Sequence, residues 1–288
     1  MAKLLITGAN GQLGNEMRCI AQNDKFNSYI FTDVAELDIT DFNAVCNFAE
    51  ISKPDIIINC AAYTSVDKAE EEIELCSRIN CLAVENIAKA AKNVGAKVIH
   101  ISTDYVYSGD AQMPYSEEDE TNPKSVYGTT KLEGEMRLLN ILPEESIVIR
   151  TSWLYSSFGK NFVKTMILLG NERDSLNVVC DQRGTPTYAR DLAKAIITIV
   201  ETRDFVAGVY NFSNEGECSW YDFACEIHKL AGIDCLVKPI ATNEYPTKAA
   251  RPAYSVLDKT KIKNIYRIDI PEWRESLKEC IRLLNNNI

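Results

Sequence analysis

The sequence predicts an α/β protein with a doubly wound parallel sheet of the Rossmann type and a smaller, interleaved α/β lobe. Short runs rich in isoleucine and valine alternate with longer helical patterns through the first half of the chain. Strands buried on both faces of a parallel sheet have such runs, and the longer stretches can form right-handed crossover helices. The first run also leads directly into a glycine-rich turn that opens a helix.

The expected elements follow this alternation. Strands are expected over 3–7, 29–33, 55–61, 97–103 and 146–153, and helices over 12–22, 41–52, 70–93 and 126–141. Asp41 is a plausible N-cap of the second helix. After about residue 155 the rhythm loosens, with helices near 161–170, 189–202, 219–231 and 273–286 and strands at 176–181 and 208–213. We therefore assign residues 1–155 to the sheet domain and 156–288 mainly to the smaller lobe, interleaved with the last sheet strands.

Composition narrows the class of protein. The 288 residues, 46% of them apolar, can bury the core of one large domain. Ten cysteines without a C-x-x-C motif indicate reduced thiols in a cytoplasmic protein. No signal peptide and no run near the roughly 18 apolar residues of a membrane span is evident. The formal charge of −10 argues against nucleic acid as a partner. Any phosphate that the protein binds must therefore be held by groups within its own site and not by a generally basic surface.

The glycine-rich turn "ITGANGQLG" is a candidate dinucleotide site. Gly8, Gly11 and Gly14 would let a pyrophosphate approach the helix N-terminus, where free N–H groups and the helix dipole attract anions. Asp33 ends the second strand 19 residues after Gly14, at the usual place of the carboxylate that binds the adenosine ribose. A Walker-type phosphate loop is excluded because Gly-Lys-Ser/Thr is absent. The 1–155 domain is therefore expected to bind a dinucleotide.

The residues after Asp33 bear on the choice of coenzyme. They include Glu36 and no lysine or arginine, so a 2′-phosphate would meet negative charge there. This pattern favours NADH over NADPH. The further coenzyme contacts expected at the carboxyl ends of the strands are Asp38, Ile39, Ala61 and Ala62.

Tyr127 and Lys131 form a candidate proton-donating pair. Their i, i+4 spacing places them on one helix face, a pattern that is also common on a merely polar face. Thr103 ends the fourth strand at the ligand-facing edge, which favours the catalytic interpretation. An ammonium beside a phenol eases loss of the phenolic proton, as carbonyl reduction by a bound coenzyme requires. His100 is expected to be an ordinary strand residue.

Several stretches along nearly the whole chain resemble the extended short-chain dehydrogenase/reductases, and within them the dTDP-4-dehydrorhamnose reductases. The stretches are "GANGQLG", "AAYTSVDKAE", "STDYVYSG", "VYGTTKLEGE", "RTSWLY", "NFVKTM", "DQRGTPTYARDLA" and "RPAYSVLD". The resemblance implies a catalytic triad of Thr103, Tyr127 and Lys131, with Asp104 and Trp153 touching the sugar. It also implies a coenzyme site whose pyrophosphate contacts are Gly11, Gln12 and Leu13, whose adenosine contacts are Asp33, Asp38 and Ile39, and whose middle contacts are Ala61, Ala62 and Tyr63.

The implied reaction is reduction of the 4-keto group of dTDP-4-dehydro-6-deoxy-L-mannose to dTDP-L-rhamnose, with Tyr127 delivering the proton. Trp153 also fits a core aromatic, and Arg251 a structural pair with an acidic loop. Some family members are dimers bridged by magnesium through glutamates, and Glu16 matches one of these. Arg190 occupies another matching position, and an arginine repels a divalent cation. We therefore predict no metal and leave a homodimer open.

Three alternatives remain at this stage. A sugar-nucleotide epimerase could use the same triad without net consumption of coenzyme. A 4,6-dehydratase of this superfamily typically carries an Asp-Glu pair after the threonine, whereas Asp104 is followed here by Tyr105. A non-catalytic binding subunit of the same fold, like the regulatory subunit of methionine adenosyltransferase, would not need Thr103, Tyr127 and Lys131 together.

Overall fold

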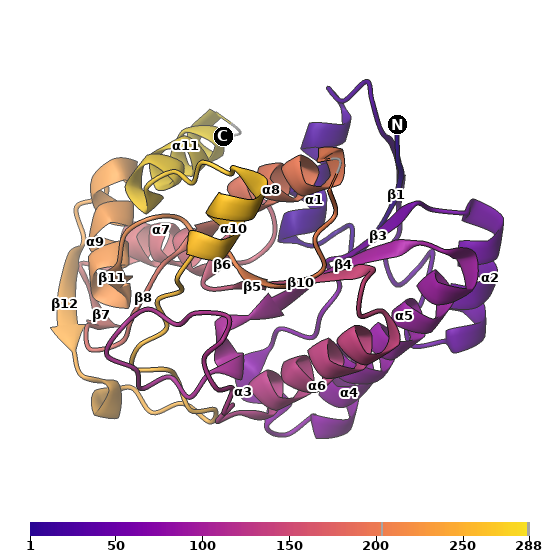
Figure 1. Cartoon of the computed structure of the whole chain (residues 1–288). Helices are drawn as coiled ribbons and strands as arrows, with labels where there is room; N and C mark the ends of the chain where they lie inside the picture. Colours follow the sequence, from indigo (N-terminus) through magenta and orange to yellow (C-terminus); the bar gives the residue numbers. More distant parts are fainter. Residues whose placement is uncertain (203, 287–288) are drawn as a thin grey trace.

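A parallel six-stranded sheet forms the centre of the molecule (Figure 1). The computed structural model describes residues 1–202 and 204–286. The strand order is β10-β5-β4-β3-β1-β2, and every neighbouring pair is parallel, which confirms the predicted doubly wound fold. The order changes direction between β1 and β3, where such sheets bind ligands at their carboxyl edge. The strands are β1 (Lys3–Thr7), β2 (Ser28–Phe31), β3 (Ile56–Asn59), β4 (Lys97–Thr103), β5 (Ser146–Thr151) and β10 (Gly208–Asn211).

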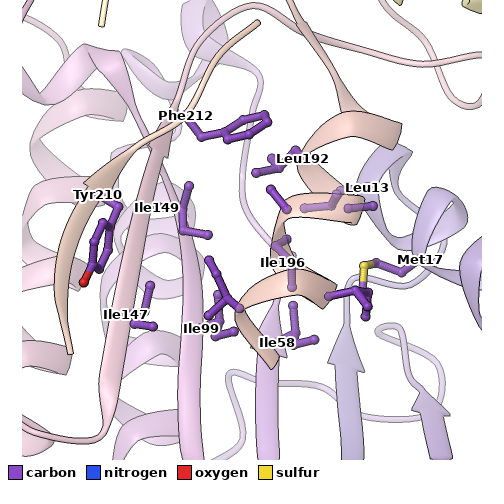
Figure 2. Packing of buried hydrophobic residues seen from close by; sticks show 14 of the residues in the cluster. Leu13, Met17, Ile58, Ile99, Ile147, Ile149, Leu192, Ile196, Tyr210 and Phe212 are labelled. Carbon is purple, nitrogen blue, oxygen red and sulfur yellow. The ribbon is translucent and has the colours of Figure 1, made fainter. Parts of the chain in front are cut away.

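Helices cover both faces of this sheet (Figure 1). On one face, α1 (Gln12–Ala21) and α8 (Ala189–Glu201) pack through Leu13, Met17, Leu192 and Ile196. Figure 2 shows these side chains gathered with the strand residues Ile58, Ile99, Ile147 and Ile149. On the other face lie α2 (Phe42–Ser52), α5 (Ala83–Val94) and α6 (Val126–Ile141), packed on Leu5, Ile57, Val98 and Val148. Because alternate residues of each strand face opposite layers, both sets must be apolar.

The second half of the chain contributes both to the sheet domain and to the smaller lobe. β10 is a strand of the central sheet, and α8 and α10 (Thr260–Tyr266) add side chains to the core on one face of it, as the predicted interleaving requires. The smaller lobe has its own core around Tyr155, Phe223 and Trp273. The division at residue 155 remains a prediction. The lobe elements are α7 (Phe162–Glu172), α9 (Trp220–Ala231), α11 (Trp273–Asn286), the parallel pair β7 (Ser175–Val179) and β12 (Leu236–Ile240), and the short pairs β6 (Leu154–Tyr155) with β9 (Thr187–Tyr188) and β8 (Arg183–Gly184) with β11 (Cys218–Ser219).

The helix expected over 70–93 is confirmed in the main, since residues 73–94 are helical without a break, but a π-helical turn interrupts the α-helix. The segment consists of α4 (Ile73–Ser77), the π-helical turn η1 (Arg78–Leu82) and α5, and the short helix α3 (Val66–Ala69) precedes it. The turn lies where α6 approaches closely: a Cβ on Gly134 would sit 2.2 Å from the Asn80 carbonyl oxygen. The Asn80 side chain in turn hydrogen-bonds both the N–H and the carbonyl of Tyr63. A π-turn thus places Asn80 where it holds the segment after β3.

Two local predictions are confirmed. The Asp41 carboxylate accepts the N–H of Ala44 at 3.0 Å and caps α2. All ten cysteines are free. Within residues 1–202 and 204–286, none of the helices has both the length and the apolar character needed to cross a bilayer.

Candidate active site

The glycine-rich turn between β1 and α1 leaves no room for side chains. Gly8 has φ +65°, and a Cβ there would lie 2.6 Å from the backbone of Ala61. A Cβ on Gly14 would lie 2.5 Å from Ala9. Gly11 is the N-cap of α1 and has no side chain. The N–H groups of the first turn of α1 therefore receive no hydrogen bond from a capping side chain and can bind a ligand. This cradle fits a pyrophosphate.

Asp33 is already engaged by the backbone around this turn. Its carboxylate accepts the N–H of Asn10 at 2.8 Å and the N–H of Val34 at 2.9 Å. The side chain therefore lies beside the glycine turn, as the dinucleotide hypothesis requires. Carboxylate oxygens can accept several hydrogen bonds, so capacity remains for ribose hydroxyls.

Arg18 is a cation near this site that the sequence analysis missed. Its guanidinium lies over the Phe31 ring, 4.5 Å from the centroid, and Nε donates to the carbonyl of Ala9 at 3.4 Å. The next N–H along the backbone is that of Asn10, which binds Asp33. A positive charge therefore lies close to the acidic end of β2. Only the packing of α1 on β2 places it there, so inspection of the residues after Asp33 could not find it.

The other predicted coenzyme contacts differ in exposure and in whether their side chains are already hydrogen-bonded within the protein. Ala61 and Ala62 follow β3 beside Gly8, in half-buried positions. The Tyr63 hydroxyl donates to Glu72, which raises the pKa of the phenol to about 12. Ile39 is buried and Asp38 is exposed, its carboxylate accepting from Thr40. The Gln12 side chain is occupied by Leu154 and Asn161, and Leu13 packs in the core, so both offer the turn their backbone only.

Thr103 and Tyr127 meet at the carboxyl end of β4. Thr103 is the last residue of the strand. Tyr127 is the second residue of α6, which is capped by the Ser125 hydroxyl accepting the N–H of Gly128. Gly128 is needed because a Cβ there would lie 2.2 Å from the Tyr105 carbonyl oxygen. Burial raises the pKa of the Tyr127 phenol, and the neighbouring Thr103 hydroxyl opposes part of that rise. At rest the phenol therefore holds its proton.

Lys131 lies one turn further along α6 and is 1% exposed. Its amine donates to the carbonyl of Ile101 at 2.6 Å and lies 3.2 Å from Nε2 of His100. Burial lowers the pKa of Lys131 to about 8, against the opposing effect of Glu135. The amine is thus committed to the sheet beneath the site and not to a surface carboxylate.

Asp104 follows Thr103 and is 3% exposed. One carboxylate oxygen accepts from the Thr103 hydroxyl at 3.0 Å, while Oδ2 is buried without a hydrogen-bond partner in the described part of the chain. Burial raises the pKa of Asp104 to about 6, although the nearby Ser255 and Thr103 hydroxyls act in the opposite direction. An unsatisfied buried oxygen of this kind is suited to receiving a hydroxyl group of a ligand.

A cleft of about 1030 Å³ opens between the sheet and the lobe. Tyr105 lines it and lies edge-on to Tyr127, with ring centroids 5.5 Å apart, so the cleft adjoins the catalytic candidates. Its cations outnumber its acids although the whole chain is acidic, which suits a diphosphate. The charged lining residues are Lys68, Arg173, Lys238, Lys248 and Arg251 on the basic side and Asp67 and Glu244 on the acidic side.

Trp153 forms part of an aromatic wall next to this cleft. Its ring is stacked on that of Trp220, a cleft-lining residue, with centroids 3.6 Å apart. A Cβ on Gly184 would lie 2.8 Å from two atoms of the Trp153 indole. The Trp153 backbone has φ +47°, a conformation that non-glycine residues rarely adopt. These contacts agree better with a residue that borders the cleft than with an aromatic that only fills the core.

The two terminal nitrogens of Arg251 have different environments. Nη2 donates to Asp67 at 2.6 Å, which is the acidic-loop pair anticipated from the sequence. Nη1 is buried without a hydrogen-bond partner among the residues that the structure describes. Because Arg251 lines the cleft, this second nitrogen is a candidate phosphate donor.

Glu16 is not available as a metal ligand. It is 0% exposed, and its carboxylate accepts from Arg190 at 2.9 Å and from Ser156 at 2.6 Å. Arg190 also bonds Glu279 at 3.0 Å. The position that suggested a bridging metal thus holds an internal ion pair. The absence of a metal and the possible homodimer remain predictions.

Comparisons with known proteins match nearly the whole chain to one family. The family model described as the RmlD substrate binding domain matches residues 2–286. The curated dTDP-4-dehydrorhamnose reductase of Aggregatibacter actinomycetemcomitans is 43% identical, over 96% of this chain and 98% of that protein. A crystal structure of a Clostridium acetobutylicum dTDP-4-dehydrorhamnose reductase superposes with a TM-score of 0.94 at 48% identity, covering 98% of this chain and 99% of that chain. The Bacillus anthracis enzyme, crystallised in complex with NADP, has a TM-score of 0.92 at 39% identity, with the same coverages of 98% and 99%.

Proposed function

Because the chain belongs to the RmlD family of dTDP-4-dehydrorhamnose reductases, we propose that it reduces the 4-keto group of dTDP-4-dehydro-6-deoxy-L-mannose to form dTDP-L-rhamnose. The observation that supports the proposal is that Tyr127 lies next to the Thr103 hydroxyl and to the cleft-lining Tyr105, with the buried amine of Lys131 one turn along the same helix and a cleft with excess positive charge alongside. The product would serve cell-surface polysaccharide synthesis, and free thiols fit a cytoplasmic enzyme.

The coenzyme would lie over the glycine turn. Gly8, Gly11 and Gly14 leave the space for its pyrophosphate, and Asp33 accepts from the adenosine ribose. When bound, the reduced nicotinamide supplies a hydride. The sequence favoured NADH, but this preference has no support from the relatives: the Bacillus anthracis enzyme was crystallised with NADP. We propose that Arg18 supplies the positive charge for a 2′-phosphate, so that NADPH is accepted as well as NADH.

The chain's own groups would move and hold the proton. Tyr127 keeps its phenolic proton at rest, because burial raises its pKa, and can deliver it to an oxygen that becomes an alkoxide. Thr103 would hold that oxygen after exchanging its present hydrogen bond to Asp104. Protonated Lys131, on the same helix face, would stabilise the phenolate that remains. Trp153 and Asp104 would border the sugar.

The test is a turnover assay with enzymatically prepared dTDP-4-keto-6-deoxyhexose and either NADPH or NADH. We expect one coenzyme to be oxidised per sugar reduced, with dTDP-L-rhamnose as product. An epimerase would interconvert sugars without net oxidation of coenzyme. A binding subunit would oxidise none, and either result would contradict the proposal.

A further inference from the structure

A buried chain of hydrogen bonds connects Lys131 to the backbone N–H of Ala61, one of the residues expected to contact the coenzyme. Its members are Thr7 on β1, Asn59 on β3 and His100 on β4, each at most 1% exposed. Asn59 Oδ1 accepts from the Thr7 hydroxyl at 2.7 Å and from the N–H of Ala61 at 3.2 Å. Asn59 Nδ2 faces His100 Nδ1 at 3.0 Å, and His100 Nε2 faces the Lys131 amine at 3.2 Å.

The orientation of the Asn59 amide decides the state of His100. Because the Ala61 backbone can only donate, the amide oxygen must face Ala61. The amide nitrogen, which can only donate, then faces His100 Nδ1. That ring nitrogen must therefore be unprotonated and must accept the hydrogen bond.

The state of His100 decides in turn what Lys131 can be. Burial lowers the pKa of His100 well below its usual value, and Lys131 lowers it further, so the ring is neutral. With Nδ1 bare, the single ring proton sits on Nε2 and points at the Lys131 amine. An ammonium has no lone pair to receive it, whereas an uncharged amine can accept from Nε2 and still donate to the Ile101 carbonyl.

We propose that His100 is a positioning residue whose tautomer follows the charge of Lys131, and that Asn59 passes this change to the N–H of Ala61. The uncharged amine pairs with Nε2–H, the state that the orientation of the Asn59 amide favours. When Lys131 gains a proton, the His100 proton moves from Nε2 to Nδ1 and the Asn59 amide rotates to accept it. The network gains one proton in total, the ring stays neutral, and the Ala61 N–H is released at the coenzyme-binding edge.

The other groups around Lys131 do not replace this control. Glu135 on α6 raises the pKa of the amine, as do the thiols of Cys60 after β3 and Cys76 on α4. Glu135 is itself held by Arg150 and Ser102. Cys76 is hydrogen-bonded to Thr130. Of these neighbours, only His100 presents a donor that must be withdrawn before the amine can be charged.

The direct test is ¹⁵N NMR of histidine-labelled enzyme without ligands, because the chain contains only His100 and His228. The ¹⁵N shifts distinguish a protonated from an unprotonated ring nitrogen. We expect the His100 ring to stay neutral while its proton moves from Nδ1 to Nε2 as the pH rises through the pKa of Lys131. His100→Phe assigns the signals by their loss, and the His228 signals, from a ring whose nitrogens both face backbone carbonyls, serve as the internal reference.

Two variants sharpen the outcome. In Lys131→Met the proton should remain on Nε2 at every pH, because no ammonium forms. In Asn59→Asp the carboxylate can accept from both Ala61 and His100, so the proton should remain on Nδ1. An imidazolium, an unchanged tautomer in the wild type, or a switch that persists in Lys131→Met would overturn the proposal.

A kinetic arm connects the switch to the proposed reduction. Asn59→Asp should shift the basic limb of the pH–rate profile upward by roughly one pH unit or more, because the charged amine gains the fully bonded state. An unmoved limb would contradict the connection to catalysis. This arm rests on the proposed function, whereas the NMR arm does not, so failure of the switch and failure of the reduction can be told apart.

Discussion

The indole of Trp153 lies nearly parallel to that of Trp220, at 11°, with ring centroids 3.6 Å apart. Trp153 lies just after β5 of the central sheet, whereas Trp220 begins α9 of the lobe. Trp220 lines the cleft itself, and Trp153 also lies close to Gly184. The pair therefore connects the sheet edge that carries the reaction to the lobe that would hold the nucleotide sugar.

Truncation of this wall should weaken substrate binding more than chemistry. For Trp220→Ala we expect a loss of about 1 kcal/mol, or roughly fivefold in KM for the nucleotide sugar, because a stacked aromatic pair is removed. The KM for coenzyme should not change. Trp220→Phe keeps a ring and is the matched control. Steady-state kinetics with each substrate varied would check this, and an equal rise in both KM values would contradict it.

Tyr127→Phe removes the proton donor and keeps the ring. We expect kcat to fall by roughly 10²–10⁴-fold, while coenzyme affinity measured by fluorescence titration stays within the error of the wild type. Tyr29→Phe makes the same chemical change at a phenol that bonds Asp24 and is not one of the proposed catalytic residues, and should leave kcat unchanged. A Tyr127→Phe enzyme with wild-type turnover would show that the phenol is not the acid.

Arg18 should discriminate between the two coenzymes. Arg18→Gln removes the charge beside Asp33 but keeps a polar side chain. We expect KM for NADPH to rise roughly 10–100-fold through loss of a charge-assisted hydrogen bond, with little change for NADH. Arg18→Lys should retain part of the NADPH affinity. Equal effects on both coenzymes would mean that Arg18 acts only through its packing on Phe31.

Asp104 should make the protein less stable as the pH rises. Its pKa of about 6 lies above the ordinary value of 3.8, so the folded state favours the protonated form. Stability from this group is fully present below about pH 4 and is lost as the pH rises to about 6, an effect on the order of 3 kcal/mol. Asp104→Asn cannot ionise and should therefore be more stable than the wild type at about pH 8 but not at about pH 4.

Urea unfolding of both proteins at both pH values measures this difference in stability. Turnover assays on Asp104→Asn measure the effect of the substitution on catalysis. We expect a raised KM for the sugar, since Asp104 Oδ2, which is without a hydrogen-bond partner among the described residues, is the group proposed to receive a sugar hydroxyl. A variant less stable than the wild type at the higher pH would contradict the assignment of a penalty to the buried carboxylate.

The Glu135–Arg150 pair beneath the site should be essential to folding. The Glu135 and Arg150 side chains are 1% and 6% exposed, and three hydrogen bonds from Arg150 to Glu135 are joined by one from Ser102. Arg150→Met would leave Glu135 charged and unpaired, for which we expect a loss of about 3–5 kcal/mol in the free energy of unfolding. Lys229→Met breaks an exposed pair with Glu226 and should lose less than about 1 kcal/mol. Equal losses would contradict the role of burial.

Elements with a strong local pattern could be predicted from the sequence. The isoleucine-rich strands and α6 fall where expected, and the Asp41 cap follows from its own side chain. The π-turn at Asn80 could not be predicted, because its cause is a close contact with Gly134 on another helix. Two-residue strands such as β6 and β8 are too short to show alternation, and β12 contains Pro239, which argues against a strand.

The site shows the same division. Gly8, Asp33, Thr103, Tyr127 and Lys131 are recognisable because each has a typical place relative to a strand end or helix face. Arg18 and Asn59 act through contacts between separate elements, which no spacing along the chain reveals. The sequence predicts an ordinary strand residue at His100, and His100 does lie in β4, but its ring nitrogens connect Asn59 with Lys131.

The most direct test of the central claim is to follow hydrogen from the coenzyme to the sugar. NADPH deuterated at C4 of the nicotinamide, on the face that is transferred, would be incubated with the enzyme and the 4-keto nucleotide sugar, and the product analysed by NMR and mass spectrometry. We predict one deuterium at C4 of dTDP-L-rhamnose for each coenzyme oxidised. With Tyr127→Phe, deuterated product should form only at the low residual rate of that variant. Product without deuterium, or a sugar epimerised while the coenzyme is recovered reduced, would contradict the account.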